Sequence, residues 1–226
     1  MSSPLLTKSA LGTLGLGTAT AGTVYFGRDL ISNREDQKTK SSIRELIKKS
    51  KPHKRLISGN TVSDPLWKEA WKRYREENSN RDSDSWALKD WTKPSGSVDG
   101  NDNASSHLIT ACSSKADSEV ESEKDPLFVQ VLSYCTRDAL ISDLLKERAP
   151  NRTVLTENSN DNQKWNTPWG AYKSSNNKWS LTDWSTQSNS ATVPASLKTT
   201  CKSKLAVKTE SAQDGDYEDV LNWCTA

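Results

Sequence analysis

The four cysteines are the residues of this 226-residue chain whose type and spacing most clearly suggest chemistry. Cys112 and Cys135 are 23 positions apart, and so are Cys201 and Cys224, which leaves no cysteine over. Disulfides Cys112–Cys135 and Cys201–Cys224 would each close a loop worth roughly 3 kcal/mol. They would also indicate an oxidising, extracellular setting. Buried free thiols are the alternative interpretation.

No other residues form a recognisable reactive centre. A zinc site needs four close ligands, and the chain has no C-x₂-C pair. The two histidines, His53 and His107, each fall in only one copy of the repeat described below. Nucleophile elbows, phosphate-binding glycine loops and H-E-x-x-H are missing from the sequence. Asp90 and Asp183 occur in both copies and are expected to cap helices. We therefore expect no enzyme activity, no cofactor and no metal site.

An aromatic motif, W-x-x-x-W-x-x-Y followed by W-x-L-x-D-W, occurs twice. The two copies contain Trp67, Trp71, Tyr74, Trp86 and Trp91, and Trp165, Trp169, Tyr172, Trp179 and Trp184. Spacings of four and three place the first three rings of each copy on one helix face. Only 33% of the residues are hydrophobic, so we expect tryptophan to supply much of the core. The alternative is that some rings are exposed and bind carbohydrate or peptide.

The whole of the chain after residue 42 follows this repeat. Residues 43–74 match residues 141–172 without a gap, and residues 108–136 match residues 197–225. We therefore predict two tandem, mainly helical modules, 43–138 and 139–226. Residues 92–106 and 185–195 are expected to be loose surface loops. In the second copy Pro168 and Gly170 interrupt the aromatic helix, which either forms through packing or starts at Pro168.

The N-terminus is predicted to be a membrane anchor, residues 1–27. Residues 9–27 carry no charge, and nineteen helical residues suffice to cross a hydrocarbon core of about 30 Å. A cleaved signal is the alternative, because Ala19-Thr20-Ala21 fits a signal-peptidase site. Residues 28–42 are polar and are interpreted as a tether.

The charges exclude one class of partner and leave the orientation open. Basic and acidic residues balance within each predicted module, so we expect no nucleic-acid binding. A basic run from Arg44 to Arg55 could meet anionic lipid or acidic polysaccharide, although a solvated helix face also explains it. Positive charges that follow the apolar segment favour modules in the cytoplasm. The cysteine pairs favour modules outside the cell membrane.

Several motifs together resemble a family. The M-S-S-P-L-L-x-K start, the Gly/Ala/Thr-rich apolar segment, the aromatic motif and the V-L-N-W-C-T ending resemble the paralogous hypothetical proteins of haemotropic mycoplasmas. The resemblance implies a membrane-anchored surface protein of a wall-less bacterium attached to red cells. It further implies one of many related copies that serve surface display and antigenic variation. We therefore expect a function in display, through contact with host cells or plasma components. It supplies no catalytic or ligand residues.

Overall fold

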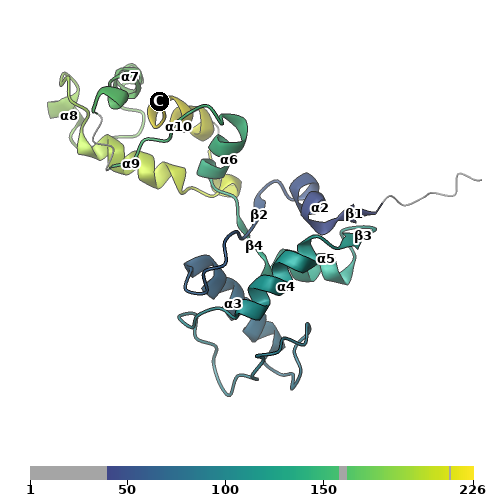
Figure 1. Ribbon diagram of the computed structural model, residues 1–226. Helices are drawn as coiled ribbons and strands as arrows, with labels where there is room; N and C mark the ends of the chain where they lie inside the picture. The colour runs from purple at the N-terminus through teal and green to yellow at the C-terminus, as the bar shows by residue number, and fades with distance from the viewer. Residues whose placement is uncertain (1–39, 158–161, 214) are drawn as a thin grey trace, which may run out of the picture. The chain divides into compact units, whose positions relative to one another are not determined.

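The computed structural model describes residues 40–157, 162–213 and 215–226, and these are mainly helical (Figure 1). The predicted anchor, residues 1–27, and the predicted tether up to residue 39 lie outside these ranges. Within them, no helix is long and apolar enough to cross a bilayer. Residues 40–226 belong to one unit, whose first half (residues 40–138) and second half (residues 139–226) are described in turn.

The helices of the first half begin where the sequence places caps. Its elements are β1 (Ser41–Ser42), α2 (Ile43–Ser50), β2 (Lys54–Leu56), α3 (Pro65–Asn78), α4 (Ser106–Ala116), β3 (Glu119–Val120), α5 (Pro126–Tyr134) and β4 (Thr136–Asp138). Asp64 and Asp125 each accept a hydrogen bond from the backbone of the first helical turn, and each precedes a proline. The strands form two antiparallel pairs, β1 with β3 and β2 with β4. The last two residues of the predicted tether, 41 and 42, are thus β1.

The second half contains α6 (Ile141–Arg148), α7 (Asn162–Lys173), α8 (Trp184–Gln187), α9 (Ala195–Leu205), the 3-10 turn η1 (Thr209–Ser211) and α10 (Asp216–Trp223). Helix α7 runs through Pro168, so the start at Pro168 is wrong. Burial of Trp165, Trp169 and Tyr172 on one face offsets the weak helix propensity. Residues 185–195 are not a loop throughout, because α8 includes residues 185–187. At the start of α8, the backbone carbonyl of Asp183 accepts hydrogen bonds from the amides of Thr186 and Gln187.

Each half has its own hydrophobic cluster, and each cluster is built around one buried tyrosine. In the first half, four rings lie within 6.0 Å of Tyr74 between centroids: Trp71, Trp86, Trp91 and Tyr134. In the second half, four rings lie within 6.0 Å of Tyr172: Trp169, Trp179, Trp184 and Trp223. The phenol of Tyr74 donates to Asp84, whereas that of Tyr172 donates to Asn177 at the matched position. Aromatic packing therefore makes up for a thin aliphatic core, and in each half one ring stacks on the tyrosine, one is tilted and two meet it edge-to-face.

Both predicted disulfides are present. Cys112 lies in α4 and Cys135 ends α5, and their Cα atoms are 5.5 Å apart. Cys201 lies in α9 and Cys224 ends α10, with the same Cα separation of 5.5 Å. Each bridge therefore joins a helix to the end of the next helix, and no described cysteine is free.

Backbone contacts at matched positions also agree between the halves. The amide of Ile43 donates to Ser118 as that of Ile141 donates to Val207. The pair Leu56 with Thr136 in the β2–β4 ladder recurs as a bridge between Val154 and Thr225. The pair Ser42 with Glu119 recurs as a bridge between Leu140 and Lys208. Within each half, the short strands and bridges thus join the same two pairs of segments. The sequence did not predict these strands.

Candidate functional site

The tryptophans singled out by their spacing lie in the two cores and do not form an exposed platform. Trp67, Trp71, Trp165 and Trp169 are buried. The other four rings of the two motifs, Trp86, Trp91, Trp179 and Trp184, are half-buried against the clusters. The ammonium of Lys115 lies 5.1 Å from the centre of the Trp86 ring, and that of Lys204 lies 5.8 Å from the Trp179 ring. In two of these four half-buried rings, a neighbouring cation therefore lies over a ring face that a sugar would need.

Asp90 and Asp183 brace the starts of two helices. Asp90 accepts hydrogen bonds from the Ser105 hydroxyl at 2.7 and 2.9 Å, and Ser105 itself caps α4. His107 Nδ1 lies 3.3 Å from the same carboxylate. Burial acts to raise the pKa of Asp90, but the hydrogen bonds from Ser105 and His107 outweigh it and lower that pKa. Asp183 likewise accepts from the hydroxyl of Ser196 in α9 at 2.6 Å. These contacts position the starts of α4 and α9.

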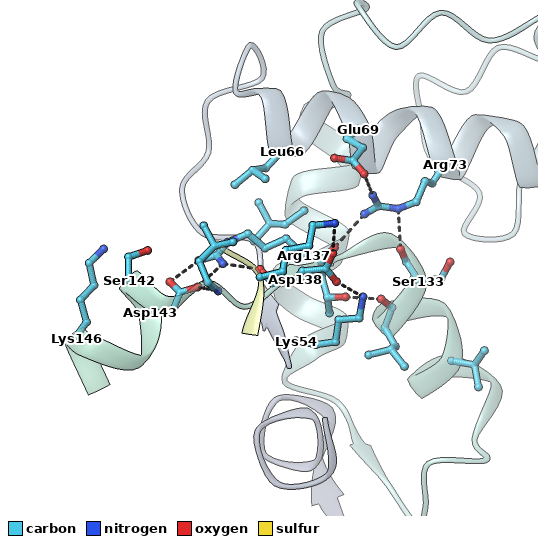
Figure 2. Close-up of a pocket in the computed structure, with 16 residues that line it drawn as sticks. Lys54, Leu66, Glu69, Arg73, Ser133, Arg137, Asp138, Ser142, Asp143 and Lys146 are labelled. Atoms are coloured by element: carbon cyan, nitrogen blue, oxygen red, sulfur yellow. Dashed lines mark hydrogen bonds and ion pairs between the residues drawn. The ribbon is translucent and has the colours of Figure 1, made fainter. Parts of the chain in front are cut away.

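A groove of about 830 Å³ lies where α3, α5, β4 and the first turn of α6 meet (Figure 2). Leu66 of α3 and Val129 of α5 line it, with 37% and 53% of their surface exposed. Among the described residues, Leu66 and Val129 are the large hydrophobic residues that are exposed. Leu132 and Ile57 add to its apolar surface. We define the groove by these four residues together with the charged residues described next.

Asp138 is the central carboxylate of the groove. It lies 2.7 Å from the ammonium of Lys208 and 2.5 Å from that of Lys54. The hydrogen bonds from Lys208 and Lys54 lower the pKa of Asp138 to about 2. Next to it, Arg137 makes two hydrogen bonds with Asp143, at 2.5 and 2.8 Å. Burial acts to raise the pKa of Asp143, but these bonds lower it and raise the pKa of Arg137. Asp138, Asp143 and Arg137 therefore stay charged near neutral pH.

Arg73 fixes the wall between α3 and α5. Its guanidinium donates to the carbonyls of Ser133 at 3.1 Å and Thr136 at 3.0 Å, and pairs with Glu69 at 3.0 Å, as Figure 2 shows. Lys146 of α6 is exposed in the same lining and has no carboxylate partner within the part of the chain that the structure describes. The groove thus combines a fixed wall, apolar side chains and cations.

Sequence reasoning did not identify this groove. Leu66 and Val129 fall outside the aromatic stripe, so periodicity gave no reason to select them. A signal was nevertheless present in the repeat, because the matched positions of the second copy hold Lys164 and Glu218. The described residues contain no group of three or more potential ligands that could hold a metal ion. The groove combines charged and apolar side chains, and the carboxylates of Asp138 and Asp143 both have lowered pKa values.

Comparisons of the chain with protein-family models, curated proteins and solved structures found no match.

Proposed function

We propose that the chain is a membrane-anchored surface protein that displays two copies of one disulfide-bonded module to host cells or plasma components. The observation that carries this proposal is the pair of matched disulfides, Cys112–Cys135 and Cys201–Cys224. Disulfides of this kind persist outside the cytosol, where thiols are not kept reduced. The proposal therefore places both modules, residues 43–138 and 139–226, on the outer face of the membrane.

The support for a duplication is the agreement of independent features at matched positions. The disulfides close at the same spacing, the aromatic clusters form around matched tyrosines, and the short strands pair in the same register. Two residues can match in sequence and still make different contacts. The shared contacts therefore support the duplication independently of the sequence match. Duplication also explains why the extended segment 136–140 ends one half and begins the next.

The support for anchoring comes from the sequence. The uncharged residues 9–27 suffice for a membrane-spanning helix, and the resemblance to the mycoplasma proteins implies a surface location. The polar loop from 92 to 104 is a suitable place for antigenic variation, because surface loops accept substitutions more readily than cores. We propose a binding role and no catalysis, since each carboxylate of the groove is already paired with a cation.

The redox state of the cysteines in intact cells tests the proposal. Cells would be treated with an alkylating reagent under denaturing conditions, without reduction, and the peptides that contain Cys112 and Cys201 examined by mass spectrometry. We expect both cysteines in disulfide-linked peptides, while a cytosolic protein from the same cells has alkylated thiols. Alkylated Cys112 and Cys201 would refute display outside the cell.

A phase separation in detergent tests the membrane anchor separately, and it should recover the full-length chain with the membrane proteins.

The alternative of a carbohydrate site on exposed tryptophans is less favoured, since four of the rings are buried in the cores and the other four are half-buried against them. Peptide binding is better supported than carbohydrate binding. Its support comes from the groove around Leu66 and Val129 and not from the tryptophans.

A further inference from the structure

The exposed apolar side chains of the groove are specific to the first half of the chain. Leu66 and Val129 correspond to Lys164 and Glu218 in the second half, while the adjacent core residue Trp67 corresponds to Trp165. Trp67 and Trp165 are both buried. The fold therefore tolerates charged residues at these two positions, and their apolar character in the first half is not required by the core. Exposed apolar surface that the fold does not need is typical of a binding site.

The charges around this apolar surface are unequal. The lining contains five cationic and three anionic side chains: Lys54, Arg73, Arg137, Lys146 and Lys208, against Glu69, Asp138 and Asp143. Each of the three carboxylates already pairs with a cation, and Asp138 forms ion pairs with two lysines. The cationic excess, with Lys146 exposed and Lys208 at 61% side-chain exposure, remains available to an anionic partner.

We propose that this groove binds an acidic peptide segment of a partner protein, with aliphatic side chains against Leu66 and Val129 and carboxylates towards Lys146 and Lys208. The inference rests on the proposed binding role and names the class of partner. A volume of about 830 Å³ accommodates a few side chains of an extended or helical segment. Charge complementarity selects the acidic peptide over a basic one, and the fixed Arg73 wall limits the rearrangement that binding requires.

The test uses the purified full-length chain in detergent micelles and a display library of short random linear peptides. We expect the enriched peptides to combine Leu, Ile, Val or Phe with Asp or Glu. The most enriched sequence would then be synthesised with a fluorescent label and its dissociation constant measured by anisotropy at increasing salt. Affinity should fall as salt rises, because carboxylates meet lysines at an exposed rim.

Two variants and one control make the test specific. The double variant L66K/V129E carries the residues that the second half has at the matched positions, and it should weaken the peptide about tenfold or more. K146E should weaken binding and flatten its salt dependence. K89E makes the same change of charge at an exposed position that does not line the groove, and should bind as the unchanged chain does.

Several results would overturn the inference. One is a selection that yields no peptide or only basic peptides; another is equal affinity for L66K/V129E with unchanged near-ultraviolet circular dichroism. Adsorption to anionic lipid vesicles in place of peptides, lost in K146E, would assign the groove to a lipid surface. None of these results changes the redox state of Cys112 and Cys201 in cells, so failure of this inference and failure of the proposed location remain distinguishable.

Discussion

Removal of one disulfide at a time measures how much each half depends on its cross-link. In the variant C112A/C135A neither thiol remains, and C201A/C224A makes the same change in the other half. The sequence separation of 23 is identical in the two loops. The loop-entropy relation gives each cross-link roughly 3.4 kcal/mol through its constraint on the unfolded chain. We expect each variant to lose about 3 kcal/mol from the half that carries it.

The loss should be large relative to the stability of the half. A small domain typically has about 5–15 kcal/mol of unfolding free energy, and these cores are thin in aliphatic side chains. Urea titrations followed by tryptophan fluorescence and near-ultraviolet circular dichroism would give the free energy of unfolding by linear extrapolation. In each variant the other half keeps its disulfide and serves as the internal reference.

One outcome would refute this reasoning directly. If both variants lost less than about 1 kcal/mol, the cross-links would not be the main support of these thin cores. A single shared transition in either variant would show instead that the two halves unfold together. The ion pairs of Asp138 with Lys54 and Lys208 provide a physical route for such coupling.

Further predictions concern single side chains. Trp71→Ala and Trp169→Ala should each cost about 3–5 kcal/mol in a urea titration, because both rings are buried, and a cost below about 1 kcal/mol would remove them from the core. Asp138→Asn should cost about 1–2 kcal/mol at neutral pH. Its folded pKa, about 2, lies below the unfolded value, so the contribution is present above roughly pH 4 and is lost as the pH falls towards 2. The variant should lack this acid-dependent loss, and an unchanged profile would exclude the ion pairs as its origin. Pro168→Ala should stabilise the second half by about 1 kcal/mol, since a proline inside α7 removes a helix hydrogen bond; a lower melting temperature would show that the ring packs better than alanine.

The features that the sequence predicted depend on spacing within a short stretch. The rings of Trp67, Trp71 and Tyr74 share a face because helical geometry alone places them there, and all three are buried. The cysteine pairing followed from a spacing repeated in both copies.

The features that the sequence did not predict depend on residues far apart in the chain. Strands of two or three residues, such as β1 and β4, are too short to show an alternating pattern. Asp138 pairs with Lys54 and Lys208, and Lys54 lies 84 positions away from it along the chain. The groove also depends on residues far apart in the chain, because Leu66 and Val129 come from different helices. Comparing the two copies for positions where only one is apolar would have selected both residues.

Protease treatment of intact cells tests the central claim most directly. Cells would be exposed to a protease that cannot cross the membrane, and residues 43–226 detected with an antibody raised against that region, alongside a cytosolic marker protein. The proposed surface display predicts that the signal is lost from intact cells while the cytosolic marker survives. If the region were protected until the cells were lysed, and then digested, the modules would face the cytoplasm and the account would be contradicted.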